Sequence, residues 1–409
     1  MSEITRVEPD LQFIKYLKSA GGDSMKKCYQ CATCSVVCPL ATDGNPFPRK
    51  EMIWAQWGLK EKLAADPDIL LCHQCGDCTA YCPRGAKPGD VLGAIRAYAY
   101  THFGFPQGLA KLCSDGKNLP ILIGIPVLII GILWMISGGM ALPDAETTFK
   151  EVGFGHFFGH WDFHWLTKNV FFIDLIFIPA FFFAAFAAFK GAKAMWDRMS
   201  DSLDANPDFR PSAGQFVVDF LAPAVIESVK HKRFNECGVN RNRVIGHLPL
   251  LLSFIALLAV TSYSFLRKDL FSLLVSEELR AVLHGPIPLA DPFKVLANIG
   301  AIALIVGVGI LWVNRSRNEA EQGSRATFYD WFLIGLIMSV GISGLGAEIV
   351  RLLGIVWLAY FFYFVHLVSI FMLFLYMPYT KFAHMVYRIV AMAFEKYRES
   401  RFVNPAVGE

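Results

Sequence analysis

The hydrophobic pattern of the chain changes near Leu119. Residues before this point are charged and rich in cysteine, whereas long uncharged stretches follow it, separated by polar segments. A helix needs roughly 20 apolar residues, at about 1.5 Å rise per residue, to cross the hydrocarbon core of a bilayer. Six segments meet this length, the fifth only with its flanking residues, and they lie at about 119–142, 167–190, 246–266, 294–313, 328–348 and 353–380. The pattern therefore predicts an all-α membrane protein with a bundle of six transmembrane helices.

The basic residues in the loops predict an orientation. Nine lysines and arginines fall within 190–243, between the second and third predicted spans, and Arg315, Arg317 and Arg325 mark the next loop on that side. The positive-inside rule makes this side cytoplasmic. We therefore expect a multi-pass protein of the inner (cytoplasmic) membrane with both chain ends in the cytoplasm. The formal net charge of +3 is too small to indicate a nucleic-acid partner.

Eight of the ten cysteines form two copies of the spacing Cys-x2-Cys-x2-Cys-x3-Cys-Pro, within 28–39 and 72–83. In two-cluster ferredoxins the first three cysteines of such a run hold one 4Fe-4S cluster, and the fourth ligates the other cluster. The predicted ligand sets are Cys28, Cys31, Cys34 and Cys82 for one cluster, and Cys72, Cys75, Cys78 and Cys38 for the second. Disulfides are disfavoured because residues 1–22 lack an apolar signal-peptide core. Zinc usually binds paired Cys-x2-Cys units, so it would not explain the positions of the third and fourth cysteines in each run.

The residues around these motifs predict helices. A proline and a glycine bound a helix over 46–59, which 60–65 continue, and apolar residues share one face of a second helix over 88–100. We therefore expect an α-helical ferredoxin domain with two 4Fe-4S clusters at 1–105. A linker at 106–118, a transmembrane cytochrome b domain at 119–390 and a cytoplasmic tail at 391–409 follow it.

Histidines in the predicted spans indicate bound haem, because imidazoles are uncommon inside membranes unless they have a function. His247 begins the third span, and His384 follows the sixth at the same predicted depth. Two facing imidazoles can hold the iron of a haem b. The alternative is that both are interfacial residues that reach into water. An iron–sulfur domain on the same side favours haem, since its clusters need a redox partner.

His366 is the predicted ligand of a second haem b. It lies 18 residues before His384, which on one continuous helix is five turns, or roughly 27 Å, so the two rings would point the same way near opposite membrane faces. The outer connection offers His156, His160 and His164 as its partner, at a spacing that shares one helical face. The alternative for these three is a metal-binding surface patch or an ordinary interfacial segment.

Quinone chemistry needs an apolar slot beside a haem and a group that exchanges protons. Glu348 and Arg351, between the fifth and sixth spans, are the candidates, and Asp174 in the second span is another. The alternative is an interfacial ion pair and a polar contact between helices. Because no glycine motif of a nucleotide-binding fold is present, we expect the chain itself to bind neither flavin nor nicotinamide.

Two parts of the chain resemble known electron-transfer proteins. About residues 10–105 are similar to the small iron–sulfur subunit of heterodisulfide reductases, and roughly 225–390 to the cytochrome subunit of the membrane-bound forms. The strings that carry the likeness are Asn45-Pro46, Arg49-Lys50, Leu71-Cys72-His73-Gln74-Cys75-Gly76-Asp77-Cys78, Cys82-Pro83-Arg84-Gly85 and the residues between Lys230 and Leu248. The adjacent cysteines of the catalytic heterodisulfide reductase subunit do not occur. The pair His366 and His384 also resembles the cytochrome b subunit of respiratory nitrate reductase, although Leu257 stands where that family has another histidine.

The fusion of both parts resembles the C-type subunit of the quinone-interacting membrane-bound oxidoreductases (Qmo) of sulfate reducers. That resemblance implies a subunit of an oxidoreductase complex that passes electrons between menaquinol, haem b and the two clusters. It also implies flavin/iron–sulfur partner subunits like those of Qmo A and B, with adenylylsulfate reductase beyond them. The alternatives are the cytochrome b and iron–sulfur subunit of a membrane heterodisulfide reductase, a redox-driven ion pump that uses Asp174 and Glu348, and a membrane anchor.

Overall fold

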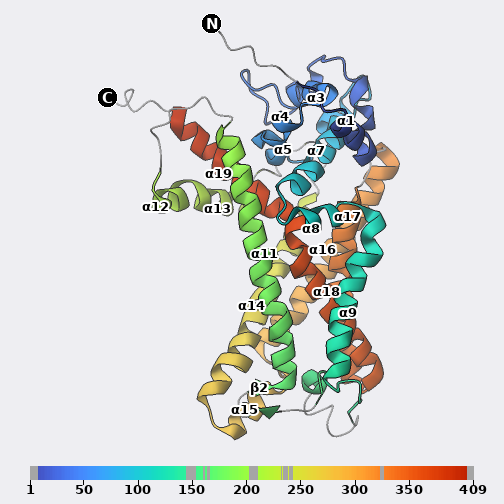
Figure 1. Ribbon diagram of the computed structural model, residues 1–409, viewed down its shortest axis with the longest axis vertical. Coiled ribbons are helices and arrows are strands. Elements are labelled where there is room, and N and C mark those ends of the chain that lie inside the picture. Colours follow the sequence, from blue (N-terminus) through green and yellow to red (C-terminus); the bar gives the residue numbers. More distant parts are fainter. Residues whose placement is uncertain are drawn as a thin grey trace.

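The computed structural model describes residues 8–143, 153–159, 162–163, 166–201, 211–231, 233, 238, 243–322 and 327–402. Most of these residues are helical, and the strands among them are β1 (Asp162–Phe163) and β2 (Leu166–Thr167), two residues each. Figure 1 shows a group of short helices at the N-terminal end of the molecule and a bundle of long helices beyond it. The predicted all-α class is confirmed.

Seven α-helices build the N-terminal part: α1 (Leu11–Leu17), α2 (Thr33–Val36), α3 (Arg49–Trp57), α4 (Lys60–Ala64), α5 (Pro67–Leu71), α6 (Asp77–Ala80) and α7 (Pro88–Phe103). The predicted helix over 46–59 begins at Arg49 and ends at Trp57. Gly58 ends it because its φ of +68° is left-handed, and because an added Cβ there would lie 2.8 Å from the Asp10 carbonyl oxygen. The predicted helix over 88–100 is α7, with Pro88 in its first turn.

The core of this part is small and apolar. Its buried side chains come from the helices on either side of the two cysteine motifs, and they include Phe13, Leu17, Phe47, Met52, Leu63, Ile69, Val91, Leu92 and Ile95. Each large apolar side chain buried in this way contributes about 1.5–3 kcal/mol. The cysteine loops lie at the edge of this core, because Cys28, Cys38, Cys72 and Cys82 pack against it while partly exposed.

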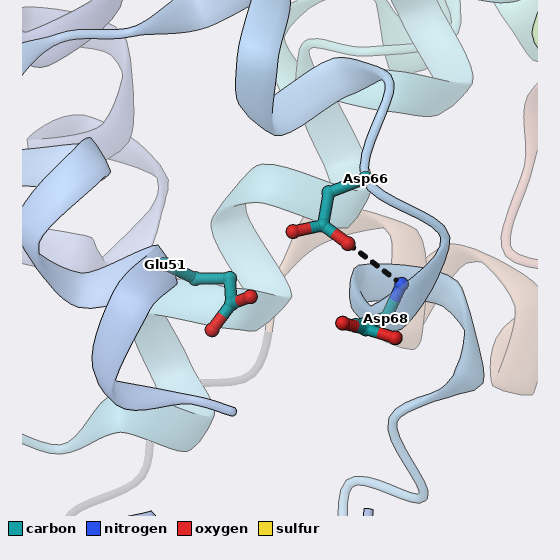
Figure 2. Close-up of side chains that lie close together, drawn as sticks. All are labelled: Glu51, Asp66 and Asp68. Atoms are coloured by element: carbon teal, nitrogen blue, oxygen red, sulfur yellow. Dashed lines mark hydrogen bonds between the residues drawn. The ribbon is translucent and has the colours of Figure 1, made fainter. Parts of the chain in front are cut away.

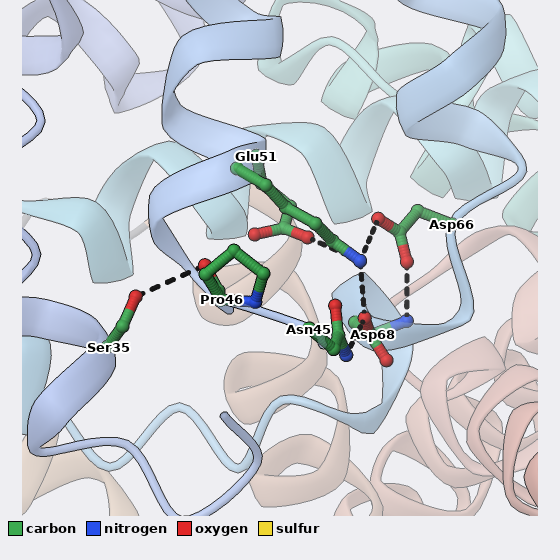
Figure 3. Close-up of polar contacts among 7 residues, drawn as sticks. Ser35, Asn45, Pro46, Glu51, Asp66 and Asp68 are labelled. Carbon is green, nitrogen blue, oxygen red and sulfur yellow. Dashed lines mark hydrogen bonds and ion pairs between the residues drawn. The ribbon is translucent and has the colours of Figure 1, made fainter. Parts of the chain in front are cut away.

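A buried group of charges links α3 to α5. The carboxylates of Glu51, Asp66 and Asp68 offer oxygens within 4.8 Å of one another (Figure 2). Lys50 Nζ lies 3.2 Å from Glu51, 3.3 Å from Asp66 and 2.7 Å from Asp68 (Figure 3). Asp66 also caps α5, and Asn45 donates to Asp68 at 2.7 Å. Burial raises the pKa of the Glu51 carboxyl, the Asp66 carboxylate raises it further, and the Lys50 ammonium opposes both.

Among the described residues, six helices are long and apolar enough to cross a membrane, as predicted: α9 (Leu119–Ile136), α11 (Lys168–Asp201), α14 (Arg243–Phe265), α16 (Pro292–Gln322), α17 (Phe328–Leu352) and α18 (Val356–Tyr376). The spans that contain α17 and α18 are the most buried, at 44% of their apolar windows against 17–22% for the others. The two helices therefore form the centre of the bundle, and the remaining spans direct most of their apolar side chains outward, where lipid would contact them.

Four shorter helices lie between or before these spans. They are α8 (Gln107–Leu112) within the predicted linker, α12 (Ala213–Gln215), α13 (Ala222–Lys230) and α15 (Glu277–His284). In Figure 1, α12 and α13 lie beside α11, which continues beyond the bundle towards the N-terminal part.

The predicted continuous helix from His366 to His384 is wrong. α18 ends at Tyr376, a 3-10 turn follows at Met377–Tyr379, and a separate helix, α19 (Ala383–Phe402), begins afterwards. Pro378 lies in that turn, and a proline removes a backbone donor and clashes with the preceding helical turn. His384 therefore lies in the first turn of α19, and the five-turn relation to His366 does not apply.

Hydrogen bonds join the N-terminal part to the membrane helices. Arg388 of α19 donates to the Cys72 carbonyl oxygen at 3.1 Å, and Arg96 of α7 donates to the same oxygen at 3.3 Å. Arg198, near the end of α11, pairs with Glu61 at 2.5 Å, and Thr101 Oγ1 lies 2.9 Å from the Tyr329 hydroxyl. These contacts place the second cysteine motif directly against α19.

Replacing Lys50 by methionine tests the buried charge group. Lys50→Met leaves three buried carboxylates without their cation, and breaking a buried ion pair in this way costs about 3–5 kcal/mol. We expect the thermal transition of the iron–sulfur absorbance to fall sharply. The control is Lys193→Met, since Lys193 pairs with Asp197 only at the surface, and such a pair contributes about 1 kcal/mol or less. Equal transitions for the two variants would contradict this role of Lys50.

Candidate functional site

The two cysteine motifs form loops of the same backbone shape. Gln30 and Ala32 in the first loop have φ values of 60° and 69°, and Gln74 and Gly76 in the second have 53° and 88°. Left-handed residues reverse the direction of a chain within a few residues. A short helix, α2 or α6, follows each loop. Each motif can therefore wrap its first three cysteines around a small volume.

The fourth cysteine of the second motif lies near the first motif. Burial raises the pKa of the Cys34 thiol to about 11, with repulsion from Cys28, Cys31 and Cys82 contributing to the rise. Thiols that repel one another as they ionise are held together when iron binds the deprotonated form. The structure thus brings together the four cysteines of the first predicted set.

The cysteines of the second predicted set also influence one another. Burial raises the pKa of the Cys38 thiol to about 12, with Cys72 and Cys75 adding to the rise. Burial likewise raises the pKa of Cys78, followed by repulsion from Cys72, Cys75, Cys38 and, least, Cys34 of the first set. Cys38 comes from the first motif, and its effect on Cys78 indicates that it lies near the second motif.

Donors point at several of these sulfurs. The backbone N–H groups of Gln74 and Ala86 lie 3.4 Å from the sulfurs of Cys72 and Cys82. The Gln30 side chain lies at the same distance from Cys28. Hydrogen bonds to cluster sulfurs are one of the ways in which a protein sets a reduction potential. This arrangement suits thiolates that carry negative charge.

A cavity of about 360 Å³ separates the second cysteine loop from the membrane helices. Residues 72–74 form part of its wall, and His247 of α14 and His384 of α19 form another part. The rest of the wall includes apolar residues of α14, α16 and α17, charged residues such as Arg96, Asp330 and Arg388, and His231 at the end of α13. One cavity therefore contacts both a cysteine motif and the two histidines that the sequence predicts as ligands.

The rings of His247 and His384, predicted as a pair, lie close to each other. Their centroids are 6.3 Å apart and their planes are inclined at 80°. A metal–imidazole nitrogen bond is about 2 Å long, so two rings on opposite sides of one metal have centroids roughly 6 Å apart. His384 Nδ1 hydrogen-bonds to the Lys381 carbonyl oxygen. A carbonyl only accepts, so in the neutral ring Nδ1 carries the proton and Nε2 keeps its lone pair. These observations fit a haem bound between the two rings.

His231 contacts His247 and was missed by the sequence analysis. Its Nε2 lies 2.7 Å from His247 Nδ1. The local signal was weak, because a histidine among Lys230, Lys232 and Arg233 looks like part of a basic loop. Only the return of α13 towards α14 brings the two rings together.

His366 lies at a second cavity, of about 310 Å³, near the opposite end of the bundle. Its Nδ1 lies 3.1 Å from the Val340 carbonyl oxygen. An added Cβ at Gly344 would lie 3.0 Å from the His366 ring, so α17 and α18 approach closely here. His284, the last residue of α15, lines the same cavity and was also missed, because this short helix lies outside the predicted spans.

The predicted partners of His366 have different outcomes. His160 and His164 lie outside the described residues. His156 is described at the end of the turn Gly153–His156, and the described cavity wall includes residues 153–155 of that turn but not His156 itself. His156 therefore gains no support over the other two.

Glu348 and Arg351 line the second cavity with His366. Glu348 pairs with Lys294 of α16 at 2.8 Å and accepts from Asn298 at 3.3 Å. The sequence predicts Glu348 and Arg351 as a polar pair, and the structure adds Lys294 as the ion-pair partner of Glu348. Asp174 is not among the described residues that line either cavity.

Comparisons with known proteins concern the N-terminal part. Residues 24–86 match the family model of the 4Fe-4S dicluster domain. The chain is 38% identical over 88 residues to the C-type subunit of the H(2):CoB-CoM heterodisulfide,ferredoxin reductase from Methanothermobacter marburgensis, and equally to that from Methanothermobacter thermautotrophicus. Each match covers 21% of this chain and 47% of the relative, so the chain spans about half the length of the curated relatives it matches. No solved structure matches.

The comparisons and the apolar helices together show what class of protein this chain is. Residues 24–86 are a 4Fe-4S dicluster domain, and six apolar helices follow it. The chain is a membrane-associated iron–sulfur electron-transfer protein whose N-terminal part is related to the C-type subunit of heterodisulfide reductase.

Proposed function

We propose that this chain transfers electrons between a membrane quinone and soluble redox partner subunits by way of haem b and two 4Fe-4S clusters. The observation that supports this most strongly is the cavity that is lined by Cys72 on one side and by His247 and His384 on the other. A relay needs redox centres at short distances from one another. Within this proposal, residues 1–105 are the relay domain, 106–118 the linker, 119–390 the cytochrome b domain and 391–409 a cytoplasmic tail.

The cluster ligands in this proposal are the crossed sets. Cys28, Cys31, Cys34 and Cys82 hold the cluster remote from the membrane. Cys72, Cys75, Cys78 and Cys38 hold the cluster that lies against α19. The mutual effects of the cysteines within each set support this division.

His247 and His384 are the proposed axial ligands of a haem b. Haem supplies a one-electron carrier, with a potential set by its axial ligands and surroundings. The chain contributes two rings whose Nδ1 atoms are hydrogen-bonded to other groups, which in the neutral tautomers leaves the lone pair of each ring on Nε2. Apolar side chains of α14 and α17 restrict access of water. The side of the membrane with the clusters is the cytoplasmic side in this proposal, as the loop charges indicate.

The second cavity is the proposed quinone site. A quinone ring needs an apolar slot with a few polar groups to bind its oxygens. His366, Glu348 and Arg351 provide such groups at one end of the bundle. His366 serves instead as the ligand of a second haem b in the alternative arrangement, with His156, His160 or His164 as its partner. His284 is a further histidine in this cavity and is compatible with either arrangement.

The proposed partners follow from the resemblance to the C-type component of the Qmo complexes. They are flavin/iron–sulfur subunits of the A and B type, menaquinol as electron donor, and adenylylsulfate reductase as the acceptor in dissimilatory sulfate reduction. Heterodisulfide reductase is the second candidate function, and the 38% identity of the N-terminal part to the C-type subunit of such an enzyme favours it.

A double variant distinguishes crossed from uncrossed cluster ligands. Cys28→Ala/Cys82→Ala removes two ligands of the same cluster in the crossed arrangement, so non-haem iron is expected to fall from about eight to about four atoms per chain. Cys72→Ala/Cys82→Ala is the control, since it removes a ligand from each cluster and is expected to lose nearly all iron. Iron analysis of the purified chains gives the answer, and the reverse pattern would support uncrossed sets.

Removing either proposed axial ligand tests the haem site. His247→Ala and His384→Ala are each expected to lose the haem b of the first cavity, measured as reduced haem absorbance per chain, because one imidazole holds iron much more weakly than two. His102→Ala is the control, since His102 stacks on Tyr98 within the N-terminal part. Full haem content in both ligand variants would refute the site.

Glu348→Gln tests the quinone site. The amide cannot exchange a proton, and loss of a positioned general base or acid costs about 10²-fold or more in rate. We expect haem reduction by a menaquinol analogue to slow by that order while haem content stays unchanged. Asp174→Asn is the matched control and is expected to retain the rate. An unchanged rate in Glu348→Gln would remove this residue from the mechanism.

A further inference from the structure

His231 ends α13 in an unusual conformation. Its φ of 52° is left-handed, where non-glycine residues are uncommon, and its side chain is buried, at 8% exposure. The left-handed residue ends the helix. The ring lies in the wall of the first cavity, in contact with His247.

The hydrogen bonds of His231 define where the protons lie. Its Nδ1 lies 2.9 Å from the Val229 carbonyl oxygen, which can only accept, so this nitrogen carries a proton. In the neutral ring, Nε2 of His231 is then an acceptor. The 2.7 Å contact with His247 is therefore donated by His247 Nδ1. It follows that Nε2 of His247 has no proton and keeps the lone pair that a metal needs.

We propose that His231 is a positioning residue for His247. It holds the His247 ring in the orientation and tautomer that direct Nε2 into the cavity. By accepting a hydrogen bond from Nδ1 it also makes His247 a stronger electron donor to the metal. This inference rests on the proposed haem site, and assigns to His231 a part in setting the haem potential.

Ion pairs connect the helix before His231 to α19, which contains His384. Arg233, two residues beyond it, pairs with Glu227 of α13 and with Glu395 of α19, the latter at 2.7 Å. Lys396 of α19 pairs with Glu227 at 3.2 Å. The helix that ends in His231 is therefore connected to the helix that contains His384. Helix α19 contains His384 itself, and α13, which is connected to α19, orients His247 through His231.

Two substitutions of His231 separate hydrogen bonding from packing. His231→Leu fills similar space but accepts no hydrogen bond, whereas the side-chain oxygen of His231→Gln can accept one. In the full-length protein we expect His231→Leu to raise the midpoint potential of the haem, because a weaker donor stabilises the ferric form less. Haem affinity is expected to fall by about 10- to 100-fold, as for other second-layer partners of metal ligands. His231→Gln is expected to remain closer to the unsubstituted protein in both measurements.

The outcomes distinguish this inference from the haem site itself. If His247→Ala loses haem while the potential and the ferric EPR spectrum of His231→Leu match those of the unsubstituted protein, His231 has no positioning role and the haem site stands. If His247→Ala retains its haem, the proposed site fails and the inference fails with it. Equal shifts in His231→Leu and His231→Gln would indicate a packing role and would overturn the hydrogen-bond argument. His102→Leu serves as the control for histidine loss elsewhere.

Discussion

The position of the N-terminal part against the membrane helices depends on hydrogen bonds to one atom, the carbonyl oxygen of Cys72. Arg96 of the N-terminal part and Arg388 of α19 both donate to it. Hydrogen bonds from charged donors are stronger than neutral ones, and two of them on one oxygen define both distance and direction. Arg388 lies one helical turn after His384, so the same helix contacts the second cysteine motif and lines the cavity of the histidines. If the N-terminal part moved freely on its linker, the distance between the second cysteine motif and the histidines of the cavity would not be constant.

Buried ion pairs hold other segments of the two parts in place. Lys50 and its three carboxylates hold the segment after the first motif against the helix that leads into Cys72. At the boundary of the membrane part, Asp330 of α17 pairs with Arg315 of α16 and with Lys381, which precedes α19. Buried ion pairs of this kind add little net stability but are costly to break, and they can favour one arrangement over its alternatives. In an electron carrier, the benefit we infer is a constant distance between centres.

The histidines show how a membrane protein uses hydrogen bonds to prepare a ligand. His247, His366 and His384 each have Nδ1 hydrogen-bonded to another protein group, which is the His231 ring, the Val340 carbonyl oxygen and the Lys381 carbonyl oxygen, respectively. Because one ring nitrogen is engaged in this way, the other is left to face the cavity. The same arrangement satisfies polar atoms that would otherwise be costly inside the bundle. Ligand orientation and membrane stability therefore depend on the same contacts.

The amino-acid sequence by itself determined the number of membrane helices, the all-α class and the 4Fe-4S dicluster domain. These features depend on local properties: uncharged length and cysteine spacing. It also predicted His247 and His384 as a pair, because each is an imidazole at the end of an apolar stretch. It could not show the break at Pro378, which changes the helix on which His384 lies, since many membrane helices accommodate proline. Only the tertiary structure could show that His231 and His284 line the two cavities. Each contacts residues that are far away in the chain, and such contacts leave no local pattern in the sequence.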